Sequence, residues 1–119
     1  MSAYQVAARC EEIRPGTYRA CRLDFTEVLI FNIAGAYFAV ENLCSHLGKP
    51  LAGGRFIGTQ ITCPFHSGAF DVRTGAHMCF PATKPIRTFP VRTVDGVVEV
   101  CIDGVIPASC SGAGGDVLE

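Results

Sequence analysis

Two short segments of this 119-residue chain place cysteine and histidine close together. The first is Cys44-Ser45-His46, and the second, sixteen residues further on, is Cys63-Pro64-Phe65-His66. Thiolate and imidazole are common protein ligands of iron and zinc. Zinc fingers favour cysteine pairs and histidine pairs, whereas each segment here holds one residue of each kind. The mixed pairs fit a dinuclear iron centre in which one iron takes both thiolates and the other takes both imidazoles.

The other cysteines carry weaker signals. The chain has seven cysteines and no secretory signal, so metal binding is a better explanation than a disulfide framework. His77-Met78-Cys79 is a further mixed pair that could replace one of the two segments, but those already supply four ligands. We expect Cys10, Cys21, Cys101 and Cys110 to act as small apolar side chains.

Strands must position the two segments, because no helical periodicity extends beyond the single turn Glu11-Glu12-Ile13. Two-residue turns at Ala34-Gly35 and Asp95-Gly96 predict hairpins, and Pro90 indicates a sheet edge or a bulge. The sequence therefore predicts an all-β fold with an antiparallel β-sandwich scaffold. The strands are expected at residues 4–8, 18–23, 28–33, 36–41, 86–93 and 97–102.

Both mixed pairs lie in a stretch of different composition. Residues 42–90 hold five of the seven prolines and five basic residues against Asp71 alone, within a chain of net charge −1. We interpret residues 42 to about 85 as a loop-rich, cluster-binding subdomain inserted into the scaffold, within a single domain over 1–106. The Gly- and Ser-rich residues 107–119 are expected to form a flexible tail.

Composition also excludes several classes. Ten basic residues against eleven acidic ones argue against nucleic-acid binding. The longest apolar stretch, Val28 to Val40, is too short to cross a bilayer, and with no secretory signal we expect a cytoplasmic protein. No catalytic constellation or phosphate-binding loop accompanies the metal-ligand set, so we expect an electron carrier and not an enzyme.

The two segments with their flanks resemble the cluster-binding boxes of Rieske iron–sulfur proteins. The resemblance extends over Cys44–Gly48 and Cys63–Gly68, and it covers nearly the whole chain. It includes Gly53-Gly54-Arg55-Phe56, Gly68-Ala69-Phe70-Asp71, Thr74-Gly75 and Pro81-Ala82-Thr83-Lys84-Pro85. It is greatest to the small ferredoxins that serve bacterial ring-hydroxylating dioxygenases. It implies the Rieske fold and one 2Fe–2S cluster, with Cys44 and Cys63 on one iron and His46 and His66 on the other.

Departures from the quinol-oxidising branch of the family favour a low reduction potential. Rieske subunits of cytochrome bc complexes have a disulfide between two cysteines that correspond to Lys49 and Phe65. Those subunits also have a Ser and a Tyr at the positions of Gly68 and Phe70. Fewer hydroxyl donors stabilise a reduced cluster less, so we expect a potential of about −150 mV, at the low end of the Rieske range. Phe65 is expected to cover the cluster.

The resemblance implies electron transfer from a flavin-dependent NAD(P)H ferredoxin reductase to the Rieske centre of a terminal aromatic-ring dioxygenase. We expect a monomer that docks through the tip around His46 and His66. The basic surplus of this half would then steer it toward acidic partner surfaces. The expected docking residues are Leu47, Gly48, Lys49, Pro50, Ser67 and Pro81.

Two alternatives remain open at this stage. The chain could be the small Rieske subunit of a nitrite reductase, which would purify with a large siroheme partner. It could also be a structural zinc module with the same four ligands, which would be colourless and would contain no acid-labile sulfide.

Overall fold

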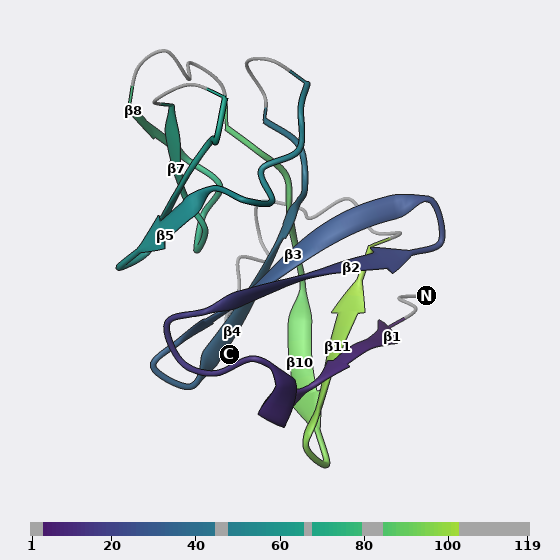
Figure 1. Cartoon of the computed structure of the whole chain (residues 1–119). Helices are drawn as coiled ribbons and strands as arrows, with labels where there is room; N and C mark the ends of the chain where they lie inside the picture. Colours follow the sequence, from purple (N-terminus) through teal and green to yellow (C-terminus); the bar gives the residue numbers. More distant parts are fainter. Residues whose placement is uncertain (1–3, 45–47, 66–67, 80–84, 103–119) are drawn as a thin grey trace.

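Three antiparallel sheets make up the regular structure of the computed structural model, which describes residues 4–44, 48–65, 68–79 and 85–102 (Figure 1). The prediction of an all-β antiparallel fold is confirmed. No helix within these ranges has the length and apolar character needed to cross a membrane.

In spatial order, the first sheet contains β1 (Tyr4–Arg9), β11 (Val97–Cys101) and β10 (Val91–Val94), and a 3-10 turn, η1 (Cys10–Glu12), follows β1. The second contains β2 (Tyr18–Leu23), β3 (Thr26–Ile33), β4 (Ala36–Glu41) and β9 (Thr88–Phe89). The third contains β5 (Arg55–Ile57), β6 (Gln60–Thr62), β7 (Ala69–Asp71) and β8 (His77–Cys79).

Both predicted two-residue turns occur. Ala34 and Gly35 have φ angles of 53° and 94°, the left-handed geometry that a tight hairpin between β3 and β4 needs. The buried Asn32 stabilises this turn, because its Oδ1 accepts a 2.8 Å hydrogen bond from the Gly35 amide. Its Nδ2 donates to the Ile13 carbonyl at 2.7 Å. Asn32, the polar residue that interrupts the apolar run, therefore has hydrogen-bond partners for both its side-chain oxygen and its side-chain nitrogen.

The single strand expected over residues 86–93 is instead two strands. Pro90 separates β9, which pairs with β4, from β10, which pairs with β11. Proline has no amide hydrogen to donate to a ladder, so the chain leaves one sheet at this residue and enters another. Both β9 and β10 are edge strands of their sheets, so the expected sheet edge at Pro90 is confirmed, and the chain also crosses from one sheet to the other there.

The second sheet lies between two separate cores, and β3 contributes to both. Leu29 and Phe31 point into one core, while Val28 and Ile30 point into the other, and all four side chains have 0% exposure. Because neighbouring side chains of a strand alternate between the two faces, this is the pattern of a strand covered on both sides. The first sheet covers one face through Val98 and Val100. The third sheet covers the other face through Ile61 and Phe70.

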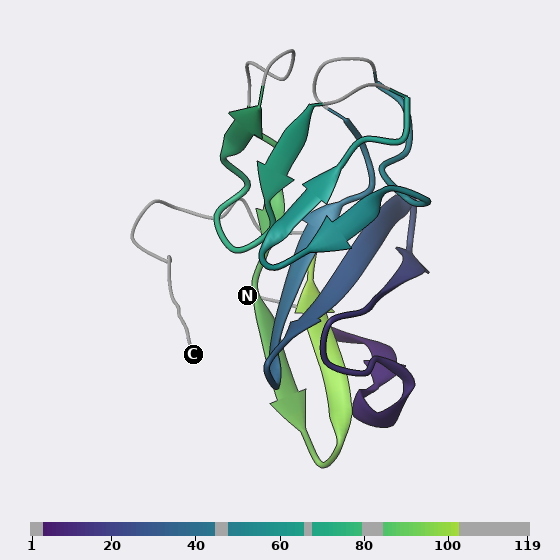
Figure 2. The ribbon, with the colours of Figure 1, turned by 60° about the vertical axis from the view of Figure 1, so that its left-hand side comes forward.

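The region expected to be loop-rich holds a complete sheet of four short strands. The strands β5, β7 and β8 lie at one end of the molecule, and the β10–β11 turn lies at the opposite end (Figures 1 and 2). Each strand of this third sheet has three residues, which is too short to show an alternating pattern in the sequence. The sheet therefore forms through contacts with the second sheet that the sequence pattern does not reveal.

Candidate metal centre

The two cysteines of the mixed pairs lie in one buried core. Cys44 follows β4 and Cys63 follows β6, and their exposures are 0% and 2%. Both belong to the core between the second and third sheets, together with Leu51, Ile61 and Phe70. Residues nineteen positions apart in the sequence thus place two thiol groups in the same apolar environment. His46 and His66 lie outside the described residues.

Both loops are closed in the same way. The Cys44 amide donates a 2.7 Å hydrogen bond to the Lys49 carbonyl, and the Cys63 amide donates a 2.8 Å bond to the Gly68 carbonyl. In both cases the acceptor lies five residues after the cysteine. The Gly48 amide also donates to the Cys44 carbonyl at 2.7 Å. The sequence positions of His46 and His66 fall inside these two closed loops, each near a buried cysteine.

Asn42 anchors the chain that leaves the first loop. Its Oδ1 accepts hydrogen bonds from the amides of Leu51 at 2.7 Å and Ala52 at 2.9 Å. Its Nδ2 donates to Glu27 Oε1 at 3.3 Å, and the residue is 8% exposed. Because the buried Asn42 oxygen accepts two backbone hydrogen bonds, this side chain holds the segment after the first loop against the second sheet. Sequence reasoning missed Asn42, and the signal available was a polar residue between an apolar strand and Cys44.

Tyr18 joins the second sheet to the segment before β5. Its hydroxyl donates to the Gly54 carbonyl at 2.9 Å and accepts from the Gly53 amide at 2.9 Å. Its ring stacks on Phe31, with centroids 5.0 Å apart. A Cβ atom at Gly54 would lie 2.0 Å from the Thr62 carbonyl oxygen, so only glycine fits there. This close approach holds β6, and with it the start of the second loop, against the anchored segment.

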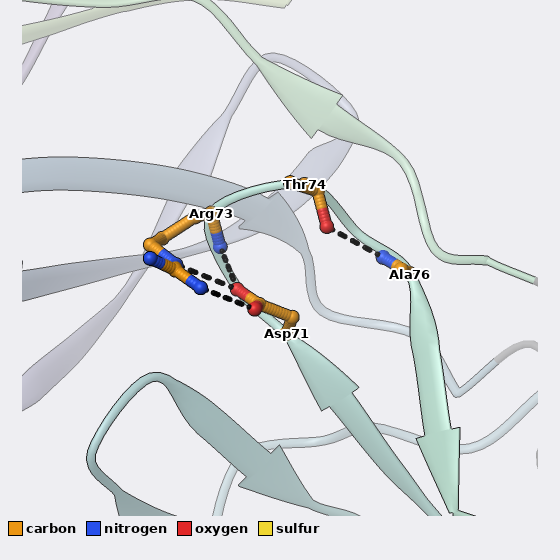
Figure 3. Close-up of polar contacts among 4 residues, drawn as sticks. All are labelled: Asp71, Arg73, Thr74 and Ala76. Atoms are coloured by element: carbon orange, nitrogen blue, oxygen red, sulfur yellow. Dashed lines mark hydrogen bonds and ion pairs between the residues drawn. The ribbon is translucent and has the colours of Figure 1, made fainter.

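Asp71 and Arg73 order the turn between β7 and β8 (Figure 3). The Arg73 guanidinium donates to Asp71 Oδ1 at 3.2 Å and to Oδ2 at 2.9 Å, and the Arg73 amide donates to Oδ1 at 2.9 Å. Burial acts to raise the pKa of the Asp71 carboxyl. The hydrogen bonds and charge of Arg73, with a further hydrogen bond from Thr59, outweigh burial and lower this pKa below its ordinary value. Gly75, in the same turn, accepts from the Ile86 amide at 2.8 Å, which ties this turn to the chain entering β9.

Three of the expected docking residues are described, and all three are exposed: Gly48, Lys49 and Pro50. Leu47, Ser67 and Pro81 lie outside the described residues. Phe65, the residue expected to cover the cluster, is 57% exposed. Its ring faces Lys49, whose Nζ lies 5.2 Å from the ring centroid.

Cys10, Cys21 and Cys101 lie outside the core that holds Cys44 and Cys63, whereas Cys79 ends β8 of the third sheet. Cys10 and Cys21 are half-buried free thiols in η1 and β2. Burial raises the pKa of the Cys21 thiol more than the Arg19 charge lowers it. Cys101 is buried in β11, and Cys110 lies outside the described residues. His77 is exposed on β8, opposite Phe70.

The donor chemistry fits a 2Fe–2S cluster with two thiolate and two imidazole ligands. Within the described ranges no three Cys, His, Asp or Glu side chains gather as a metal site, and the two buried cysteines are the described members of the four residues expected to bind the cluster. The apolar core around them shields both cysteine side chains from water. This is a suitable arrangement for two chemically different irons.

Comparison with known proteins agrees with this chemistry. Residues 3–90 match the model of the Rieske [2Fe-2S] domain. The anthranilate 1,2-dioxygenase ferredoxin subunit of Burkholderia cepacia is 44% identical over 73 residues, which are 61% of this chain and 68% of that protein. The ferredoxin of carbazole 1,9a-dioxygenase from Nocardioides aromaticivorans IC177 has 33% identity and a TM-score of 0.80, covering 84% of this chain and 98% of that one.

A second solved structure is relevant because it holds two proteins. It is a complex of reduced oxygenase and oxidized ferredoxin in carbazole 1,9a-dioxygenase. One of its chains matches with 30% identity and a TM-score of 0.78, over 85% of this chain and 94% of that chain. The matched domain model, the ferredoxin relatives and the buried cysteine pair lead to one assignment. The chain belongs to the Rieske [2Fe-2S] family and carries a cluster of that type.

Proposed function

We propose that this chain is a one-electron carrier of an aromatic-ring dioxygenase system. It accepts an electron from a flavin-dependent NAD(P)H ferredoxin reductase and passes it to the Rieske centre of a terminal oxygenase. The observation that carries this proposal is the pair of buried cysteines on two loops closed alike, at one end of a small domain. Named ferredoxin relatives and a ferredoxin–oxygenase complex among the similar structures support the same role.

The proposed ligands are Cys44 and Cys63 on one iron and His46 and His66 on the other. When bound, the cluster supplies a site that takes up and gives up one electron. The protein keeps water from the two thiolates by burying them, and it holds each loop closed through the Cys44 and Cys63 amides. Anchors outside the loops, such as Asn42, limit how far the first loop moves when the charge of the site changes.

Docking through the loop tip follows from this placement. The proposed contact residues are Leu47, Gly48, Lys49, Pro50, Ser67 and Pro81, around His46 and His66. Within the described ranges no carboxylate pairs with Lys49, so its charge is available to an acidic partner surface. Redox encounters need only a small, transient interface, which suits a monomer acting in the cytoplasm.

A reconstituted system tests the function. The purified protein should show one one-electron wave near about −150 mV. It should also restore oxygenase turnover when mixed with a reductase and a terminal oxygenase of a related aromatic dioxygenase system. A midpoint well above 0 mV, or purification with a siroheme subunit, would contradict the dioxygenase role. A colourless protein with stoichiometric zinc and no acid-labile sulfide would contradict the cluster.

Substitution of one ligand tests the site. Cys63→Ala should abolish the visible absorbance of the cluster completely, because the iron held by two thiolates loses one of them. Cys21→Ala is the matched control, since it removes a cysteine from β2 and should keep the full spectrum. Full cluster content in Cys63→Ala would contradict the proposed ligand set.

A further inference from the structure

We propose that Lys49 and Phe65 form a noncovalent clamp between the two ligand loops that slows loss of the cluster. The inference rests on the ligand set proposed above. It assigns to two exposed side chains a positioning role that neither ligation nor docking requires.

The geometry places one member of the clamp on each loop. The Lys49 Nζ lies 5.2 Å from the centroid of the Phe65 ring, within the range of a cation–π interaction. The Lys49 carbonyl accepts the Cys44 amide, so Lys49 is also the residue that closes the first loop. Phe65 lies within the second loop, which the hydrogen bond from Cys63 to Gly68 closes. A contact between these side chains therefore joins two loops that each supply one buried thiol.

Charge and exposure favour this contact over alternatives for either side chain. In the described part of the chain no carboxylate lies within ion-pair distance of Lys49. Phe65 is 57% exposed, so its ring is not held by the core that buries Phe70. An ammonium group over the ring covers part of this apolar surface without losing its own hydration. The two residues are consequently each other's described side-chain partners.

The clamp matters because the contacts that anchor the two loops lie on the segments that flank them. The chain leaving the first loop is held by Asn42, whereas the second loop lies between β6 and β7. If the loops separate, the thiolates become accessible to water and to chelators. The contact between Lys49 and Phe65 joins the two loops directly and opposes this opening, whereas the anchors act on the flanking segments.

Cluster loss from the holoprotein tests the clamp. We would follow the decay of visible absorbance in excess EDTA for Lys49→Met, Phe65→Leu and the double variant. Each single variant should lose its cluster about two- to fivefold faster than the parent, the range expected for an exposed cation–π contact. The double variant should be no faster than the faster single one, because both remove the same contact. Lys49→Arg and Phe65→Tyr, which keep a cation and a ring, should restore slow loss.

The reduction potential separates the clamp from a simple charge effect. Lys49→Met removes a positive charge near the cluster and should lower the potential, whereas Phe65→Leu should leave it unchanged while still speeding cluster loss. Arg92→Met is a control in the first sheet, because it removes a cation 4.1 Å from the Tyr4 ring together with the 2.7 Å ion pair of that cation with Glu99. The Arg92→Met variant should lose its cluster at the same rate as the parent protein.

The results that would refute the clamp differ from the result that would refute the proposed function. Cluster loss from Phe65→Leu at the parental rate, or additive effects in the double variant, would refute the clamp. Equal acceleration in Arg92→Met would also refute it, since the effect would then come from general destabilisation. A parent protein without any cluster would instead refute the ligand set.

Discussion

The two ends of this molecule are held together in different ways. In the base, made of the first two sheets, β3 pairs with β2 and with β4 over six residues on each side. In the cluster region, made of the third sheet and the two loops that begin at Cys44 and Cys63, β5 and β6 pair over three residues. Bonds from a few side chains to the backbone supplement these short ladders, at Tyr18, Asn42 and Asp71. The comparison indicates that the base has the longer strand ladders, while the cluster region has short ladders that individual side-chain anchors supplement.

The largest test of this contrast compares two neighbours on β3. Leu29→Ala and Ile30→Ala each remove a side chain with 0% exposure, so each should lower the free energy of unfolding by about 2–5 kcal/mol. Leu29 packs in the core that contains Cys44 and Cys63, and Ile30 packs in the core of the base. Urea unfolding should show both losses, but only Leu29→Ala should speed cluster loss in EDTA. Equal rates of cluster loss would mean that the two cores do not act separately.

The lowered pKa of Asp71, in the cluster region, predicts that the free energy of unfolding depends on pH. Because its folded pKa is lowered, its stabilisation is present above the unfolded value of about 3.9 and is lost as the pH falls through the folded value. Asp71→Asn should therefore cost about 1.5–3 kcal/mol at pH 7, as expected for hydrogen bonds to a charged group. The difference from the parent should shrink steadily below pH 4, as measured by urea unfolding across a pH series.

A surface carboxylate serves as the control for this measurement. Asp95→Asn lies in the exposed β10–β11 turn, where asparagine also accepts the left-handed backbone, and should change stability by less than about 0.5 kcal/mol at any pH. If Asp71→Asn shows the same difference at pH 3 and pH 7, the ionised carboxylate does not order the turn.

The smallest expected effect compares two tyrosine hydroxyls. Tyr18→Phe removes the bonds to Gly53 and Gly54 but keeps the ring stacking, and should cost about 1 kcal/mol. Tyr37→Phe removes a comparable hydroxyl in the base, which donates to the Cys10 carbonyl at 3.1 Å. Thermal unfolding should show that Tyr18→Phe and Tyr37→Phe lower the stability of the protein by similar amounts. Hydrogen exchange should show reduced protection of the Gly53 amide only in Tyr18→Phe, and an equal reduction in both would contradict a local anchor.

Local sequence signals predicted the base well, and long-range contacts explain where they failed. The bounds of β2 and β4 and both hairpin turns agree with expectation, since alternation and turn residues act over a few positions. The strand expected across Pro90 is divided because its first part, β9, pairs with β4 and its second part, β10, pairs with β11. The strands of the third sheet have three residues each, fewer than the roughly four to eight over which alternation is recognised, so the sequence pattern predicts loops there.

The sequence by itself determined the chemistry: two mixed pairs at fixed spacing, read by residue type, identify the family and its cluster. Only the tertiary structure decided that Cys44 and Cys63 share one core, that both loops are closed by the same hydrogen bond, and that Lys49 lies over Phe65. Ligand type is a property of a single residue, whereas proximity across nineteen positions depends on how the second and third sheets pack. That packing is set by apolar contacts distant in the sequence, which no local pattern records.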